Sequence, residues 1–320
     1  MKWLTNKQDT ALLLAALILL IAALFHPTIP LKRDLRNYLF VVDVTQSMNT
    51  ADMRVNDETV SRLAYTRKLL KDTIAQLPCG TNISMSVFSA ESVALLYTPI
   101  EICKNYDAIQ DNVEHLEWRM AWHGNSRLRF GMQSVSVILS SLSVPAQVVF
   151  MTDGDEAPKL NATNKTDLSE WQGGRNWLLV GVGSDEPTPI PKLDSENKVL
   201  GYWGYSNSIM APSQVISEDS VGTRDNSIAT DDYNRYLSKL EGAYLQELSS
   251  EIGAKYIRAT SAEELLGALN TQKPAGYDTT RVPIDWLLIL VAICMMLAQY
   301  RCSLVIKFNQ FRQQYFQEAI

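Results

Sequence analysis

Histidine is scarce in this chain, and a basic face is missing. Only three histidines occur in 320 residues, so no Ser-His-Asp arrangement is visible, and the G-x-S-x-G turn of many hydrolases is also missing. The 35 acidic residues outnumber the 29 basic ones, which gives a formal net charge of −6. Nucleic acid is therefore not expected as a partner. The glycine-containing segment at residues 180–183 is not followed by Lys-Ser/Thr, which excludes a P-loop.

Cysteine is also rare, with four in the chain. Cys79 and Cys103 flank residues 82–101, two strand-like runs joined by "SAES" that predict an antiparallel hairpin. Because the first strand of such a hairpin begins beside the end of the second, the two cysteines come together. The pattern favours a disulfide and hence an oxidising compartment. The alternative is a pair of small buried thiols in a reducing cytosol.

Two apolar runs lie near the ends of the chain. The first, residues 10–26, is either a short transmembrane helix or the apolar part of a signal peptide, and the lack of a cleavage site after it favours an uncleaved anchor. The second, residues 283–300, would span about 27 Å as a helix, so we expect a transmembrane segment rather than a buried core helix. Residues 1–9 and 301–320 are then expected in the cytoplasm, with 271–282 as a linker.

The basic residues around these two runs indicate opposite orientations of the chain in the membrane. Basic residues beyond the second run place the C-terminal end in the cytoplasm. The segment "LKRDLR" after the first run points the other way, so charge alone leaves the orientation open.

Residues 37–270 alternate between strand and helix patterns. "YLFVVDVT" and "AQVVFMTD" are typical of buried strands, and "SRLAYTRKLLKDTIAQL" and "AYLQELSSEIG" of helices. This alternation predicts an α/β fold with a doubly wound, mostly parallel sheet that has helices on both faces and one antiparallel edge strand from the hairpin. Residues 195–235 are a longer and more polar connection than usual, either a specific binding loop or a tolerated surface insertion.

Polar side chains follow two of the predicted strands. Asp43, Thr45 and Ser47 alternate after the first strand, so they point the same way in an extended segment. Asp153 ends a second strand, and Ser126 lies in a turn before a helix. Such ligands meet at the carboxyl ends of parallel strands and suit a hard divalent cation, Mg²⁺ or Ca²⁺. Zinc is disfavoured without histidine or cysteine. An open position would accept a carboxylate from another molecule.

The segments "DVTQS", "GNS" and "MTDGDE" resemble the three-part metal-ion-dependent adhesion site (MIDAS) of von Willebrand factor A (VWA) domains. Thr45 stands in place of the family's first serine, and Ser126 in place of its threonine. The resemblance implies a Rossmann-like VWA domain over residues 37–270, with Asp43 and Ser47 also in the metal site, Asp153 holding the ion directly or through water, and a protein partner that offers an acidic residue.

Two further segments, "VGVGSDEPTPIPKL" and "AYLQELSSEIGAKYIRATSAEELLGAL", are similar to the membrane-anchored bacterial Bat proteins and to the VWA proteins of methanol-dehydrogenase maturation (Mxa) clusters. This resemblance implies an anchor in the bacterial cytoplasmic (inner) membrane and a VWA domain in the periplasm. It also implies work with a MoxR-type AAA+ ATPase in the assembly or maturation of a periplasmic enzyme, with methanol dehydrogenase as one candidate.

We therefore expect a binding module and not an enzyme. The alternative is a metal-dependent hydrolase in which the ion activates water, and His123, Asp155 and Glu156 are the candidate general bases. A third interpretation is a structural tether whose site binds no metal.

Overall fold

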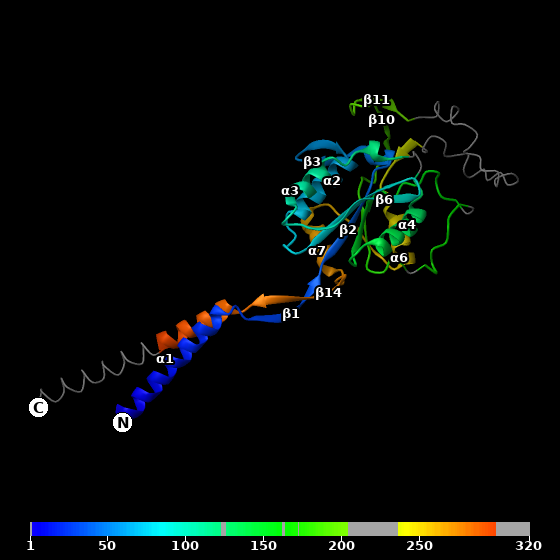
Figure 1. Ribbon diagram of the computed structural model, residues 1–320. Coiled ribbons are helices and arrows are strands. Elements are labelled where there is room, and N and C mark those ends of the chain that lie inside the picture. The colour runs from blue at the N-terminus through cyan, green and yellow to red at the C-terminus, as the bar shows by residue number, and fades with distance from the viewer. Residues whose placement is uncertain (1, 123–125, 162–163, 172, 204–235, 299–320) are drawn as a thin grey trace, which may run out of the picture. The chain divides into compact units, whose positions relative to one another are not determined.

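The structure is a computed structural model that describes residues 2–122, 126–161, 164–171, 173–203 and 236–298 (Figure 1). The chain divides into two units, each described separately below. The central unit is Leu35–Gly276, and the terminal unit combines Met1–Asp34 with Tyr277–Ile320.

A six-stranded mixed sheet forms the middle of the central unit. The strand order is β13-β8-β7-β2-β5-β6, and every neighbouring pair is parallel except β5 and β6. The predicted sheet with a single antiparallel edge strand is therefore confirmed. The strands are β2 (Asn37–Asp43), β5 (Asn82–Ser89), β6 (Ser92–Glu101), β7 (Gln147–Thr152), β8 (Leu178–Gly181) and β13 (Lys255–Arg258).

Helices cover both faces of this sheet (Figure 1). One face carries α2 (Arg62–Ile74), α3 (Tyr106–Glu114) and α7 (Ala262–Thr271). The other carries α4 (Leu128–Ser141) and α6 (Gly242–Ile252). A short 3₁₀ turn, η2 (Trp118–Met120), precedes the loop that leads to α4.

Burial on both faces explains the continuous apolar run of β2. Tyr38, Phe40 and Val42 pack into the core on the α2 face, whereas Leu39 and Val41 pack into the core on the α4 face. All five side chains are fully buried. At roughly 2 kcal/mol for each buried side chain, this single strand contributes on the order of 10 kcal/mol of apolar burial.

Two serines cap the starts of helices. The hydroxyl of Ser61 accepts the backbone N–H of Ala64 at the start of α2, and Ser261 accepts that of Glu264 at the start of α7. Gly253 ends α6 with a φ of 77°, a left-handed conformation that glycine adopts without strain.

A hairpin between β2 and α2 was not predicted. Its strands are β3 (Ala51–Val55) and β4 (Glu58–Ser61), which pair antiparallel. The turn residues Asn56 and Asp57 have φ values of 48° and 67°, as a two-residue turn between twisted strands requires.

Two small sheets follow β8. Strand β9 (Thr188–Pro189) pairs with β12 (Leu237–Ser238), and β10 (Pro191–Leu193) pairs with β11 (Val199–Tyr202). Of the predicted insertion at residues 195–235, the part from 204 onward lies outside the described residues.

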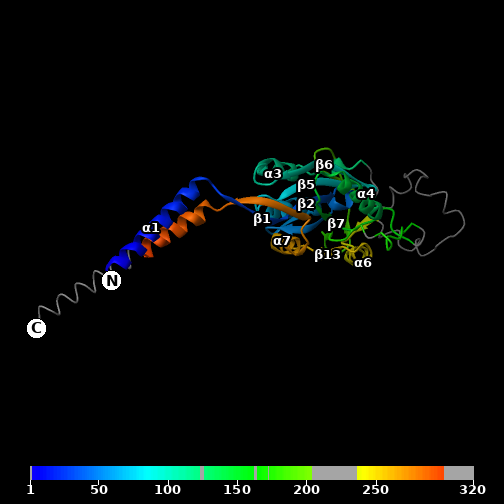
Figure 2. The same ribbon diagram turned by 60° about the horizontal axis from the view of Figure 1, so that its bottom comes forward.

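The terminal unit contains α1 (Lys2–Leu24) and a helix over residues 285–298, which lie side by side (Figure 2). The ring nitrogen Nδ1 of His26 lies 2.9 Å from a carboxylate oxygen of Asp285 where these two segments meet. Strands β1 (Thr28–Leu35) and β14 (Gly276–Pro283) form a two-stranded sheet, so residues 271–282, expected as a linker, include most of β14.

The prediction of two flanking transmembrane helices is wrong. In the part of the chain that the structure describes, no helix is both long and apolar enough to cross a membrane. The uncharged part of α1, residues 10–24, would span roughly 22 Å at 1.5 Å per residue. A bilayer core is about 30 Å thick.

Candidate metal site

Two aspartates follow neighbouring parallel strands at the same edge of the sheet. Asp43 is the last residue of β2, and Asp153 comes directly after β7. The register pairs Val42 with Met151, so the carboxyl ends of the two strands lie side by side. Both aspartates are fully buried, and the Thr152 hydroxyl donates a 2.6 Å hydrogen bond to Asp43 Oδ2. The structure therefore brings the two predicted carboxylates together.

The loop after β2 gathers three of the predicted oxygens. The backbone N–H and the hydroxyl of Thr45 both donate to Asp43 Oδ1, at 2.9 and 2.6 Å. Thr45 Oγ1 lies 3.2 Å from Ser47 Oγ, and all three side chains are almost completely buried. The 3₁₀ turn η1 (Gln46–Asn49) starts immediately after Thr45 and fixes this arrangement.

Ser126 lies at the same edge through its backbone. Its N–H donates to the carbonyl of Ala157 and its carbonyl accepts from the same residue, while a bridge to Ala90 places it beside the end of β5. Ser126 therefore lies at the carboxyl edge of the sheet, the edge that also carries the two aspartates. Its side chain is 4% exposed, and its hydroxyl has no hydrogen-bond partner among the described residues.

Burial and mutual repulsion make the charged forms of the two aspartates costly. Burial first, and the neighbouring charge of Asp153 second, raise the pKa of Asp43 from 3.8 to about 7. Burial also raises the pKa of Asp153, although the guanidinium of Arg62 opposes this effect. A cation between the carboxylates would favour their ionised forms.

The donor set fits a hard divalent cation. Asp43 and Asp153 supply carboxylate oxygens, and Thr45, Ser47 and Ser126 supply hydroxyl oxygens, the ligand types that Mg²⁺ and Ca²⁺ prefer. The buried hydroxyl of Ser126 otherwise forgoes a hydrogen bond, which costs roughly 1–3 kcal/mol. A bound cation would give this oxygen a partner and offset the repulsion between the aspartates.

Arg62 is a site residue that the sequence pattern did not indicate. Its side chain is fully buried, and Nη1 donates a 2.7 Å hydrogen bond to Asp153 Oδ2. On its other side, Nε and Nη2 contact both carboxylate oxygens of Asp52, in strand β3. The Asn56–Asp57 turn was the one sequence signal that could have revealed the hairpin carrying Asp52.

The three candidate general bases lie in different surroundings. Asp155 accepts a 2.5 Å hydrogen bond from Lys159 Nζ, and its own N–H donates to Asp153 Oδ1. Glu156 accepts a 2.7 Å hydrogen bond from the Tyr244 hydroxyl, and burial raises its pKa. His123 lies outside the described residues.

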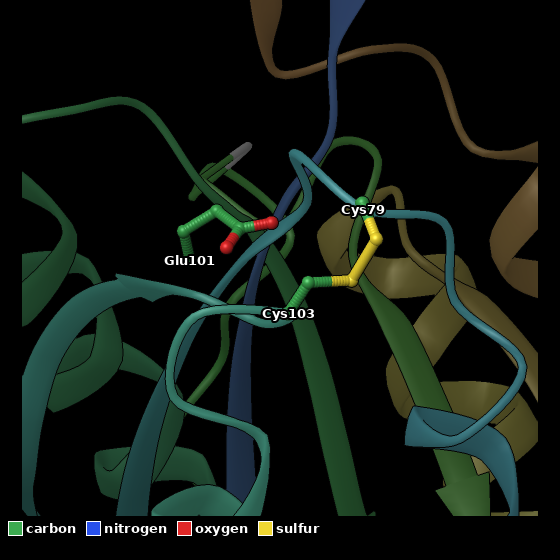
Figure 3. Close-up of side chains that lie close together, drawn as sticks. All are labelled: Cys79, Glu101 and Cys103. Carbon is green, nitrogen blue, oxygen red and sulfur yellow. A yellow bond between two sulfur atoms is a disulfide. The ribbon is translucent and has the colours of Figure 1, made fainter.

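A disulfide joins Cys79, just before β5, to Cys103, just after β6, at the open end of the β5–β6 hairpin (Figure 3). Glu101 lies beside it and accepts the backbone N–H groups of Gly80 at 2.6 Å and Lys104 at 2.8 Å. These bonds lower the pKa of Glu101 and tie together the two segments that the disulfide connects.

Residues 38–156 match the family model of the von Willebrand factor type A domain. This part of the chain is a VWA domain. All five metal-site residues lie within it, as do Arg62 and Asp52.

The curated relatives are similar over a limited segment. The UPF0353 proteins of Mycobacterium sp. strains KMS and JLS are 24% identical to this chain over 160 residues, which is 48% of this chain and 45% of theirs. The matched part of the chain thus spans slightly less than half the length of these relatives.

Two solved structures are similar to this chain at low identity. An aerotolerance-related membrane protein from Bacteroides fragilis, carrying multiple mutations to serine, is 16% identical with a TM-score of 0.47, covering 74% of this chain and 98% of that one. An uncharacterised membrane-spanning protein from Vibrio fischeri is 15% identical with a TM-score of 0.29, covering 74% and 97%. Likeness at this level says nothing about what this VWA domain binds.

Proposed function

We propose that the VWA domain is a binding module that holds Mg²⁺ or Ca²⁺ and uses it to capture an acidic side chain of a partner protein. Asp43, Thr45, Ser47, Ser126 and Asp153 would hold the ion. The bound cation supplies a positive charge at the carboxyl edge of the sheet, where a partner carboxylate completes the ligand set. No covalent bond is made or broken when the partner carboxylate binds, so the module is a receptor and not an enzyme.

The observation that carries the proposal is the buried hydroxyl of Ser126, without a hydrogen-bond partner among the described residues, at the edge of the sheet that carries two buried carboxylates. Buried hydroxyls in folded proteins nearly always have a partner. Asp43 and Asp153 follow different strands, and the charge of Asp153 raises the pKa of Asp43 although Arg62 is paired with Asp153. A cation accounts for both features at once.

The alternative hydrolase receives less support from the surroundings of its candidate bases. The carboxylate of Asp155 is paired with Lys159, and that of Glu156 receives the Tyr244 hydroxyl. Both carboxylates therefore have partners in the folded domain. A general base needs to reach the water molecule that it activates.

Calorimetric titration with Mg²⁺ and with Ca²⁺ tests the proposal. Wild type should bind one of these ions, Asp43→Ala should not, and Ser126→Ala should bind more weakly. Ser140→Ala is the matched control, because its exposed hydroxyl bonds only within α4. Absence of divalent binding in wild type would remove the metal from the function. Metal-dependent turnover of a generic phosphoester, lost with Asp43→Ala, would favour the hydrolase.

We further propose that the chain associates with a membrane surface through its terminal unit. Large apolar side chains of this unit are exposed, among them Ile18, Phe25, Trp286 and Leu290. Large exposed apolar surfaces mark contact sites for membranes or proteins. Co-flotation of the chain with phospholipid vesicles is expected, and the variant Ile18→Glu/Leu290→Glu should float less.

The compartment and partners proposed are those that the resemblance implies. The Cys79–Cys103 disulfide supports an oxidising location such as the periplasm. We propose a role there in the assembly or maturation of a periplasmic enzyme, together with a MoxR-type AAA+ ATPase. Pull-down from membranes with Mg²⁺ or with EDTA, using wild type and Asp43→Ala, tests this role. A partner retained equally in all four samples would contradict capture through the metal.

A further inference from the structure

The guanidinium of Arg62 lies fully buried behind the candidate metal site. All five of its N–H groups have acceptors. Nη1 donates to Asp153 Oδ2 and to the Ser238 hydroxyl, both at 2.7 Å. Nη2 donates to the Ser238 carbonyl at 3.1 Å and to Asp52 Oδ2 at 2.6 Å. Nε donates to both oxygens of Asp52 at 3.1 and 3.0 Å.

The backbone next to this guanidinium leaves room for it because a glycine lies there. Gly183 follows β8 with a φ of 138°, and a Cβ atom at this position would lie 2.9 Å from Arg62 Nε. The next residue, Ser184, donates its backbone N–H to Asp52 Oδ2 at 3.1 Å. Asp52 is therefore held by Nε and Nη2 of Arg62 and, independently, by the backbone N–H of Ser184, and its side chain is only 4% exposed.

We infer that Arg62 is a positioning residue of the metal site, and that Asp52 sets how strongly Asp153 holds the cation. This inference rests on the metal binding proposed above. Asp52 is not itself a ligand: it lies on the side of the guanidinium that faces the β3–β4 hairpin, while Asp153 contacts Nη1.

The sign of the effect follows from the charges. Arg62 fixes the orientation of Asp153, but its positive charge also repels any cation that Asp153 binds. Asp52 neutralises much of this charge in a two-point contact. The side chains of Arg62 and Asp52 are buried, so solvent and salt screen the interactions among Asp52, Arg62 and Asp153 only weakly. Without the charge of Asp52, Arg62 would compete with the metal for Asp153.

Mg²⁺ titration of the full chain by calorimetry tests the inference with charge-matched variants. Asp52→Asn should weaken Mg²⁺ binding by about tenfold, which corresponds to roughly 1.4 kcal/mol. Asp57→Asn removes the same charge from the turn of the same hairpin, where the side chain is fully exposed, and should leave the affinity unchanged. The double variant Asp52→Asn/Arg62→Gln removes the uncompensated guanidinium and should recover most of the lost affinity.

Two results would overturn the inference while the proposed function stands. One is an Asp52→Asn affinity equal to that of wild type, and the other is a double variant as weak as the single one. Failure of wild type to bind Mg²⁺ or Ca²⁺ overturns both the inference and the proposed function.

A measurement on wild type covers the case in which Asp52→Asn does not fold. The Nε–H resonance of Arg62 should shift on Mg²⁺ addition, because the cation and Nη1 share Asp153. Arg129 is the internal reference, since it is equally buried but paired with Glu251. An Arg62 resonance that moves no more than that of Arg129 at saturating Mg²⁺ contradicts the positioning role.

Discussion

Replacing Asp43 by asparagine should stabilise the metal-free protein above neutral pH. Burial and the charge of Asp153 raise the pKa of Asp43 from 3.8 to about 7, so the folded state binds this proton more tightly than the unfolded state does. The stability of the wild type therefore falls as the pH rises from the unfolded value towards the folded value, and stays low above it. Asparagine resembles the protonated carboxyl and does not titrate.

The size of the effect follows from the pKa difference. At about 1.4 kcal/mol per pKa unit, the ionised carboxylate costs roughly 4 kcal/mol of folding free energy at about pH 8. In Asp43→Asn the amide NH₂ group takes the place of Oδ2 and cannot accept the hydrogen bond that Thr152 donates there. The Thr152 hydroxyl therefore has to reorient, which costs roughly 1 kcal/mol. The net gain expected for Asp43→Asn is about 3 kcal/mol at pH 8 and less than about 1 kcal/mol at pH 5.

Urea unfolding followed by tryptophan fluorescence, in EDTA at both pH values, measures this difference. Mg²⁺ should then stabilise wild type, by about 2.7 kcal/mol at a hundredfold excess over its dissociation constant, and leave the variant unchanged. A variant that is less stable than wild type at pH 8 without metal would refute the reasoning. Asp43 would then be a structural hydrogen-bonding group whose contacts with Thr45 outweigh the cost of its charge.

Four further outcomes are expected. Gly131→Ala should destabilise the domain by roughly 1–3 kcal/mol in urea unfolding, because its Cβ would lie 2.5 Å from the phenylalanine ring of β5. Gly267→Ala, also in a helix but with nothing within 4 Å, should stabilise it by roughly 0.5–1 kcal/mol. Replacing Cys79 and Cys103 by serine should cost about 3 kcal/mol, since the disulfide spans a separation of 24 residues; reduced wild type should show the same loss. Ser126→Ala should weaken Mg²⁺ binding by about tenfold and raise the melting temperature of the metal-free protein slightly, because it removes an unpartnered buried hydroxyl.

The sheet could be predicted because its local signals agree with its packing. The apolar run of β2 ends in Asp43 at the point where the strand reaches the carboxyl edge, and β7 repeats this pattern before Asp153. Ser261 and Gly253 mark helix ends through bonds made within a few residues. Information of this kind is contained in short stretches of sequence.

The burial of Arg62 beside the metal site could not be predicted in the same way. An arginine in the first turn of an amphipathic helix is normally on the surface. Its burial depends on Asp153 and Ser238, which are 91 and 176 residues away in the chain. The unpartnered state of the Ser126 hydroxyl likewise depends on atoms from several loops. The transmembrane prediction failed for a different reason: the uncharged runs indicated apolar helices, but no described helix is both long and apolar enough to cross a membrane.

The two outer strands of the sheet limit how another molecule can join it. Strand β13 is only four residues long, with its exposed Lys255 and Arg258 at the ends. Strand β6 is long, but its register with β5 is irregular near Pro99, which has no N–H to offer a further strand. Neither border is a good template for adding a strand from a second chain. Addition of strands from other molecules at the sides of the sheet, and the fibrous aggregation that follows from it, is thus discouraged.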